Sequence, residues 1–368
     1  MAVLSLIAAC GVEPEADDVA EEPDTVEEPE VDEEPEVDEE PEPAPADDDL
    51  APAALVIAQG GLGDESYNDL AYEGFQRGLA ATGLEGTPIE SDDVVAQGEQ
   101  ILRRAGETDF GLVISLEFAH GEILGPVAQD FPDAYWAIVN LVVEGDNVAS
   151  VLFEEQEGSY LAGALAARMT SVEDNPRVNA DEKVVGVIGG TKSVGIDKFI
   201  VGFIQGANDI DPEVEVLVSY SDDFGDPARG QSLAEAMFER GADIVYHVAG
   251  GTGAGVIQAA DEGGFYAIGV DTDQDGLAPG AVLTSMIKRV DVAVAELLER
   301  YAGGDFPAGE ELHFGLAEDG VNLSDFEYTR DDIPEEFLDE IEVLRQQIID
   351  GQLEVWNVVE QGYPDFFD

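Results

Sequence analysis

Short runs rich in Val, Ile, Leu and Ala alternate with amphipathic stretches along residues 54–301 of this 368-residue chain. Continuous apolar runs predict strands covered on both faces, as in parallel sheets flanked by helices. Nine such strands are too many for one small open sheet, and no closing pattern indicates an eight-fold barrel. We therefore predict an α/β fold with two doubly wound, parallel-sheet lobes. The predicted strands are residues 54–59, 112–116, 134–140, 148–153, 183–189, 215–219, 244–249, 266–271 and 282–286.

The amphipathic stretches between these strands predict helices, and the loops after the strands are the natural places for a site. Open α/β sheets bind ligands beyond the carboxyl ends of their strands. Distinctive residues do follow the strands: a Gly-rich loop at 60–63, Gly250-Gly251, Asp271 and Lys288. The predicted helices are residues 68–82, 96–107, 159–170, 198–209, 227–240, 253–262 and 290–301.

The chain is strongly acidic, with 83 Asp and Glu against 15 Lys and Arg, a net charge of −68. Such a charge excludes sequence-independent binding of nucleic acid and docking on anionic lipid through a basic patch. Residues 50–368 alone hold 62 acidic and 15 basic residues. Because salt screens their repulsion, we expect adaptation to high salt, that is, a halophilic protein. An acidic protein from an ordinary organism is the alternative.

The first residues resemble the end of a lipoprotein signal. Ile7-Ala8-Ala9-Cys10 matches the cleavage box, which implies a lipid on Cys10 and a membrane anchor at the end of segment 1–10. Cys10 is the only cysteine, and a cysteine in an irregular terminus is the alternative. Residues 11–49 hold 21 acidic residues, seven prolines and no Lys or Arg. Such a composition is typical of disorder, so we expect segment 11–51 to be an extended stalk.

An ordered set of motifs after the stalk resembles the basic-membrane-protein (BMP) family of ABC-transporter substrate-binding lipoproteins, which includes the purine nucleoside receptor A (PnrA) type. The resemblance runs from about residue 54 to 356, and the motifs occur in the family's order. They are Asp64-Glu65-Ser66-Tyr67-Asn68, Pro132-Asp133, Trp136-Ala137-Ile138-Val139, Glu157-Gly158-Ser159-Tyr160-Leu161-Ala162-Gly163, Gly189-Gly190, Phe203 with Gly206-Ala207, Ala249-Gly250-Gly251-Thr252-Gly253, Gly269-Val270-Asp271-Thr272-Asp273-Gln274, and Thr284-Ser285-Met286 with Lys288.

This resemblance implies a periplasmic-binding-protein type I fold, in which the chain crosses three times between two lobes. One lobe would hold residues 52–152 and 287–312, and the other residues 153–286 and 313–368. The implied function is capture of a nucleoside, with a purine expected, and its delivery to an ABC permease and ATPase. The protein would be a monomer on the extracytoplasmic face of the cytoplasmic membrane, held there only by its lipid.

The resemblance also implies a stacking site for a base. Tyr67 stands at the family's stacking Phe, and Phe224 resembles the aromatic residue of the other lobe; ordinary packing is the alternative for each. Asn68 suits a purine edge because an amide both donates and accepts, although a helix N-cap is its alternative. Glu117 lies near the family's base-binding Asp, with a solvated carboxylate as its alternative. We interpret the nearby His120 as a surface residue.

The resemblance also implies a ribose site. Asp271 and Lys288 take the family's ribose-binding roles, since a carboxylate accepts from two hydroxyl groups and an ammonium donates to one. Gly250 and Gly251 let the backbone approach the ligand, unless they serve only as a strand-to-helix turn.

Other functions are less well supported. Residues 186–193 and 251–256 approach the phosphate-loop and dinucleotide patterns but lack a required Gly in each case. A nucleoside hydrolase that uses Glu117 and Asp271 is disfavoured, because the sequence shows no nucleophile arrangement, metal cluster or matched acid–base pair. No cofactor or metal site is predicted. No helix-turn-helix precedes residue 54, which disfavours a DNA-binding regulator. A ligand sensor for a signalling partner, or a receptor for another small solute, stays open.

Overall fold

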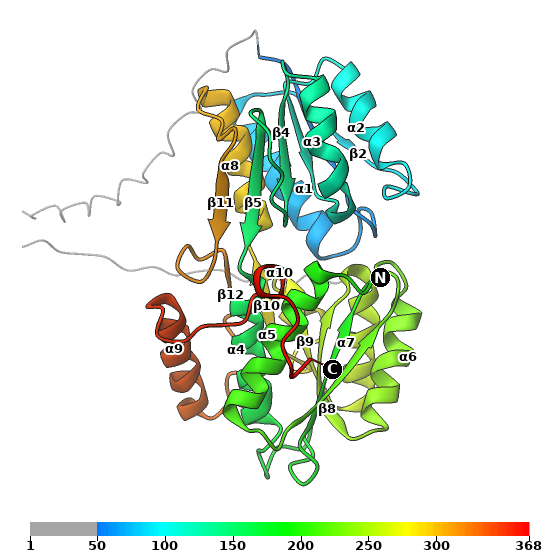
Figure 1. The fold of residues 1–368 in the computed structure, drawn as a ribbon. Helices are drawn as coiled ribbons and strands as arrows, with labels where there is room; N and C mark the ends of the chain where they lie inside the picture. Colours follow the sequence, from blue (N-terminus) through cyan, green and yellow to red (C-terminus); the bar gives the residue numbers. More distant parts are fainter. Residues whose placement is uncertain (1–49, 368) are drawn as a thin grey trace, which may run out of the picture. The chain divides into compact units, whose positions relative to one another are not determined.

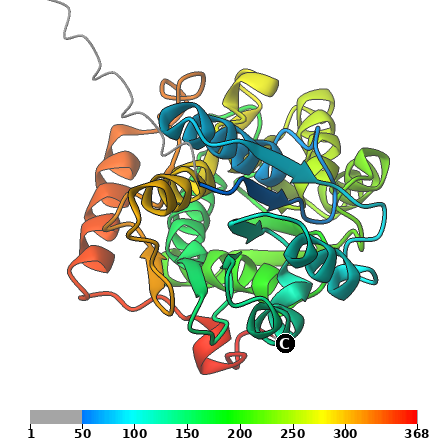
Figure 2. The same ribbon diagram turned by 90° about the horizontal axis from the view of Figure 1, so that it is seen from above.

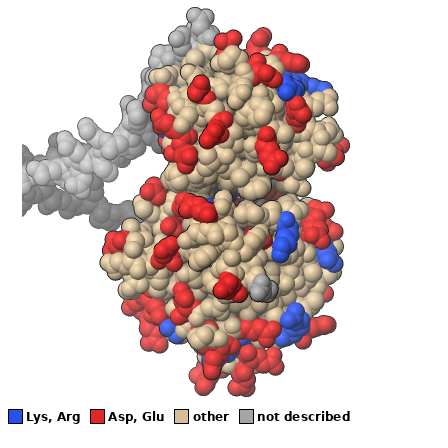
Figure 3. Space-filling model, viewed as in Figure 1, with Lys and Arg blue, Asp and Glu red and all other residues tan. Residues whose placement is uncertain are grey.

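A computed structural model describes residues 50–367. Cys10 and the acidic segment at 11–49 lie outside the described residues, so the predictions made for them stay predictions. Within the described residues, no helix is both long enough and apolar enough to cross a bilayer. The space-filling view shows Asp and Glu side chains spread widely over one face of both lobes, with few Lys and Arg (Figure 3).

The first lobe is built on a six-stranded sheet in which every strand is parallel to its neighbours (Figure 1). Helices α1 (Tyr67–Thr82) and α8 (Val290–Gly303) pack together over one face, and α2 (Gly98–Glu107) and α3 (Gly121–Asp130) over the other. The strand order is β2 (Gly86–Ile89), β1 (Ala53–Val56), β3 (Leu112–Ser115), β4 (Tyr135–Val139), β5 (Val148–Phe153) and β11 (Glu311–Phe314).

The second lobe has a six-stranded sheet whose last strand alone is antiparallel. Helices α4 (Glu155–Met169) and α5 (Val194–Ile210) cover one face, and α6 (Pro227–Phe238) and α7 (Gly253–Gly263) cover the other. The strand order is β7 (Glu215–Tyr220), β6 (Val184–Gly189), β8 (Ala242–Val248), β9 (Tyr266–Asp271), β10 (Val282–Lys288) and β12 (Val321–Leu323). The predicted α/β class with two parallel-sheet lobes is therefore confirmed.

Helices α4 and α5 approach each other closely because glycines line their contact. A Cβ added at Gly163 would lie 2.0 Å from the carbonyl oxygen of Phe203, and one at Gly206 would lie 2.0 Å from that of Tyr160. Only glycine permits such backbone contact. The C-terminal helices add outer cover: α9 (Glu335–Ile349) packs on α4 at the edge of the molecule (Figure 2), and α10 (Val358–Gln361) packs on α5.

The chain passes between the two sheets three times, after β5, after β10 and between β11 and β12. Backbone hydrogen bonds tie these crossings together: Glu154 N donates to Phe314 O at 3.0 Å, and Arg289 N donates to Gly320 O at 2.9 Å. The two residues beside the first and second crossings, Glu155 and Lys288, therefore lie where the lobes meet.

Several elements differ from the sequence predictions. The short strands β2, β11 and β12 and the helices α3 and α9 were not predicted, because strands of three or four residues show little periodicity and β2 and α3 each contain a Pro. Helix α4 begins at Glu155 rather than at 159, and α5 begins at Val194 rather than at 198. In α5 the earlier start has a clear cause, since the Ser193 side chain accepts a hydrogen bond from Ile196 N as an N-cap.

Candidate functional site

A cleft of about 1130 Å³ lies between the carboxyl ends of the two sheets. Loops that follow β1, β2, β3 and β4 line it from the first lobe, and loops that follow β6, β7, β8, β9 and β10 line it from the second. Seven of the eight predicted site residues line this cleft: Tyr67, Asn68, Glu117, Phe224, Gly250, Asp271 and Lys288. Gly251 does not line the cleft; it lies where the lobes touch, and a Cβ there would be 3.5 Å from Asp64 Cα.

Lys288, the last residue of β10, is the most enclosed cation of the cleft, with its side chain 2% exposed. Its Nζ lies 2.8 Å from Glu155 Oε1 and donates to Asn140 Oδ1 at 2.8 Å. It also lies 4.9 Å from the ring centre of Tyr67 and 5.0 Å from that of Phe153, within range of cation–π attraction. An ammonium has three N–H donors, so the described residues leave one of them for a ligand.

Asp271, the last residue of β9, places a buried carboxylate in the same cleft, at the end of the strand that pairs with β10. Its backbone has a φ of +67°, a left-handed conformation that is uncommon for a residue with a side chain. Ser66 of the first lobe donates from Oγ to Asp271 Oδ2 at 2.7 Å. Burial raises the pKa of Asp271 to about 6, against the opposing effects of Lys288 and the Ser66 hydrogen bond.

The two predicted stacking residues come from opposite lobes. Tyr67 opens α1; its hydroxyl donates to Leu116 O at 3.2 Å and accepts from Asn140 Nδ2 at 3.2 Å. The hydroxyl that distinguishes Tyr from Phe is thus paired, and burial raises the Tyr67 pKa well above its ordinary value. Phe224 is partly buried, and its ring packs against Gly190, where a Cβ would come within 2.2 Å of the ring.

Asn68 is buried, and its side-chain amide bonds to other residues of the protein. It is not the N-cap of α1, because Ser66 occupies that position. Asn68 Oδ1 accepts from Ala58 N at 2.9 Å, and Nδ2 donates to Gln59 O at 3.2 Å and to Asp64 Oδ2 at 3.0 Å. Asn68 therefore shapes the loop after β1. Burial raises the pKa of Asp64, against the lowering effect of the backbone N–H groups that it accepts from.

Glu117 is buried in the cleft wall, with 2% of its surface exposed, so the alternative of a solvated carboxylate is wrong. Its Oε2 accepts from Gln59 N at 3.0 Å, and its Oε1 accepts from Ala119 N at 2.9 Å. These two backbone N–H groups replace hydrogen bonds to water that the carboxylate loses on burial. Because a carboxylate has about four lone-pair sites, Glu117 retains acceptor capacity toward the cleft.

The interpretation of His120 as a surface residue is also wrong. The side chain is fully buried, with Nδ1 2.8 Å from Ser115 Oγ and Nε2 3.0 Å from Val94 O. Burial lowers the pKa of His120. Part of the enclosure comes from the loop at Val94, which lies 26 residues earlier in the chain. The ring is a packing element behind the cleft.

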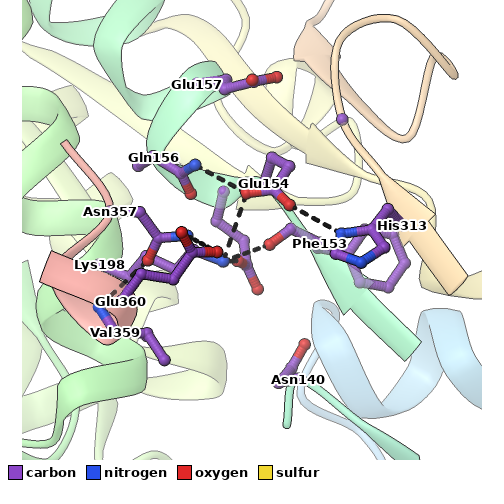
Figure 4. A network of polar contacts seen from close by, with 12 residues as sticks. Asn140, Phe153, Glu154, Gln156, Glu157, Lys198, His313, Asn357, Val359 and Glu360 are labelled. Atoms are coloured by element: carbon purple, nitrogen blue, oxygen red, sulfur yellow. Dashed lines mark hydrogen bonds and ion pairs between the residues drawn. The ribbon is translucent and has the colours of Figure 1, made fainter. Parts of the chain in front are cut away.

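The sequence analysis also missed Glu155 and Lys198, which are buried, charged residues that line the cleft. Glu155 Oε2 lies 3.1 Å from Lys198 Nζ, while its Oε1 pairs with Lys288. Burial alone would raise the pKa of Glu155, but the two ammonium groups outweigh it and hold this pKa below its ordinary value. Figure 4 shows Lys198 and Glu154 close together at the first crossing, with His313 on the other side of Glu154.

Comparisons with known proteins agree with this architecture. Residues 51–357 match the model of a family described as Bmp, ABC transporter substrate-binding protein PnrA-like. A CD4+ T-cell-stimulating antigen of Listeria monocytogenes is 33% identical over 82% of this chain and 87% of its own length. The ABC transporter nucleoside-binding protein BmpA of Lactococcus lactis is 29% identical over 82% of this chain and 88% of its own.

The solved structures show the same fold. An ABC-transporter solute-binding protein of Aeropyrum pernix superposes with a TM-score of 0.74 at 28% identity, over 82% of this chain and 92% of that one. A solute-binding protein of Burkholderia graminis, solved in complex with D-arabinose, shares the fold at 15% identity with a TM-score of 0.57. The resemblance drawn from the motifs is confirmed: this chain belongs to the Bmp family of PnrA-like ABC-transporter substrate-binding proteins.

Proposed function

We propose that this protein captures a nucleoside, with a purine base expected, in the cleft between its lobes and delivers it to the permease and ATPase of an ABC transporter. The observation that carries the proposal is that Asp271 and Lys288 end neighbouring strands and both line the cleft. The carboxylate accepts from the 2′- and 3′-hydroxyl groups of a ribose, while the remaining N–H of Lys288 donates to a hydroxyl oxygen.

The rest of the cleft supplies what a base requires. Tyr67 and Phe224 offer one aromatic side chain from each lobe, and stacking a base on an aromatic ring is worth roughly 1–3 kcal/mol. The spare lone pairs of Glu117 accept from N–H groups on the edge of a base such as hypoxanthine or guanine. Gly250 leaves room for the base or ribose to approach the backbone. The nucleoside-binding name of the Lactococcus lactis relative supports the same assignment.

Ligand binding and lobe closure are coupled in this proposal. Groups that contact the ligand come from both lobes, so the ligand favours the closed arrangement over an open one. The three crossings, after β5, after β10 and between β11 and β12, serve as the hinge between the two lobes. The closed form is the one that the permease would recognise.

We further propose that the protein is a monomer anchored to the extracytoplasmic face of the membrane by a lipid on Cys10. Relatives from Pyrococcus abyssi and Pyrococcus horikoshii are named lipoproteins, which supports the anchor. The acidic, Pro-rich segment 11–51 would hold the lobes away from the lipid surface as a stalk.

A thermal-shift screen tests the substrate class. The chain with Cys10→Ser, which removes the acylation site, is screened in molar KCl against purine and pyrimidine nucleosides, free bases, sugars and amino acids. A ligand at 100 times its dissociation constant adds about 2.7 kcal/mol to stability, which gives a clear shift. We expect stabilisation by inosine, guanosine or adenosine. A shift with sugars or amino acids, and none with any nucleoside, would reject the nucleoside.

A further inference from the structure

Glu155 is a buried carboxylate of the cleft that pairs with two lysines, yet it lies on neither of the strands that carry the proposed ribose contacts. It is the first residue of α4, directly after the first crossing, and its side chain is 4% exposed. Its two oxygens serve two different lysines: Oε1 lies 2.8 Å from Lys288 Nζ, and Oε2 lies 3.1 Å from Lys198 Nζ. One anion therefore holds two buried cations.

The two lysines are not equivalent. Lys198 directs its ammonium at protein groups: it donates to the carbonyl oxygen of Phe153, pairs with Glu155, and lies 3.9 Å from Glu154 Oε2. Lys288 is held by Glu155 and Asn140 and keeps one donor. Lys198 thus acts as a counter-ion for Glu155, whereas Lys288 is a donor aimed into the cleft.

Two carboxylates of the cleft, Glu155 and Asp271, are possible ion-pair partners for Lys288. Both Glu155 and Asp271 line the cleft beside it, but among residues 50–367 the ion pairs of Lys288 within 4.0 Å include Glu155 and not Asp271. An ammonium without Glu155 would turn to the nearest remaining carboxylate, because a buried charge without a partner is costly. The Asp271 oxygens would then accept hydrogen bonds from Lys288 instead of from ligand hydroxyl groups.

We propose that Glu155 is a positioning residue of the ligand site: it holds Lys288 away from Asp271, so that the carboxylate and the ammonium both stay available to the hydroxyl groups of the ligand. The identity of those hydroxyl groups rests on the proposed nucleoside function, whereas the placement of Lys288 does not.

The first test is binding by Glu155→Gln, which keeps the side-chain shape and removes the charge. Calorimetry compares inosine with 3′-deoxyinosine. Because a hydrogen bond to a charged group is worth about a tenfold change in affinity, we expect the preference for inosine to fall about tenfold while 3′-deoxyinosine changes little. An equal loss for both ligands would indicate a merely structural role and overturn the proposal.

Two further variants keep this test decisive. Glu155→Gln removes the anion that two buried lysines share and risks misfolding, so the charge-balanced double variant Glu155→Gln with Lys198→Met carries the same comparison. Glu154→Gln is the matched control, since this neighbouring carboxylate pairs with His313 at 3.2 Å and accepts from Gln156 Nε2 at 2.8 Å, without an ion pair to Lys288. The control should keep the wild-type preference for inosine.

A second measurement needs no ligand. The chain has only four lysines, Lys183, Lys192, Lys198 and Lys288, so ¹⁵N-lysine labelling gives a short, assignable set of ammonium signals. The buried Lys288 ammonium should give a slowly exchanging signal that shifts or is lost in Glu155→Gln and in the double variant, but not in Glu154→Gln. An unchanged Lys288 signal would overturn the proposal even if nucleosides bind. If the wild type binds no nucleoside, the proposed function is rejected. The Lys288 signal then still tests the role of Glu155.

Discussion

Replacing Asp271 with Asn is expected to stabilise the protein and weaken its ligand binding at the same time. Burial raises the pKa of Asp271 from 3.8 to about 6, so above pH 6 the folded state carries a carboxylate that it disfavours. A difference of about two units corresponds to about 3 kcal/mol at neutral pH. Asn removes this cost, and its amide oxygen still accepts from Ser66.

The sign of the pH dependence follows from the same shift. Because the folded state holds the Asp271 proton more tightly than the unfolded state, this group lowers the free energy of unfolding as pH rises from about 4 to about 6. Asp271→Asn should lose that contribution and gain stability above pH 6. Ribose binding has the opposite requirement, since protonation removes acceptor lone pairs, and the wild-type affinity should fall below about pH 6.

The loss of affinity comes from the missing charge. A hydrogen bond to a charged group contributes about 1.5–3 kcal/mol, so exchanging the carboxylate for an amide should weaken inosine binding by about 2 kcal/mol, or roughly 30-fold. Thermal unfolding and calorimetry at pH 5 and pH 7.5 measure both effects. Asp243 is the matched control: it is buried away from the cleft, burial also raises its pKa to about 6, and Asp243→Asn should alter stability without altering affinity. A destabilised Asp271→Asn variant with wild-type affinity would refute the reasoning.

Three other outcomes are expected. Tyr67→Ala should weaken nucleoside binding by about 1–3 kcal/mol in calorimetry. Tyr67→Phe keeps the stacking face and should keep most of the affinity. Equal affinities for wild type and Tyr67→Ala would remove this ring from the site. Gly163→Ala should lower the free energy of unfolding by about 1–3 kcal/mol in denaturant titrations, since the new Cβ would meet the Phe203 carbonyl oxygen, whereas Gly276→Ala, with no atom nearer than 4.0 Å, should change it little. The midpoint of thermal unfolding should rise between 0.1 M and 3 M KCl as salt screens 62 carboxylates against 15 cations in residues 50–368, and a salt-independent midpoint would contradict the expected halophilic adaptation.

The fold was predictable because its central strands are buried on both faces. Strands such as β6 and β9 are continuous apolar runs, and a run of this kind indicates a parallel sheet without knowledge of its partners. Edge elements carry no such signal: β2 contains Pro88 and has only partly buried or exposed residues, and its place in the sheet depends on pairing with β1. The same limit applies to β12, which has three residues.

The site was predictable where a residue follows a strand and missed where its environment comes from distant segments. Asp271 and Lys288 end adjacent parallel strands, so their proximity follows from the topology. Glu155 lies before the predicted helix at 159–170, so it was not considered as a site residue. No local pattern indicates its burial, because its partners Lys198 and Lys288 belong to other elements. A solvated carboxylate stayed open as the alternative for Glu117 for the same reason, because its backbone partner Gln59 lies after another strand.

The most direct test of the account is a calorimetric comparison of inosine with 2′,3′-dideoxyinosine on the Cys10→Ser chain. The two ligands share the base and differ in the hydroxyl groups assigned to Asp271 and Lys288. We predict that inosine binds at least tenfold more tightly than the dideoxynucleoside. Equal affinities, or no binding of inosine by folded, ligand-free protein, would contradict the proposed role of the cleft.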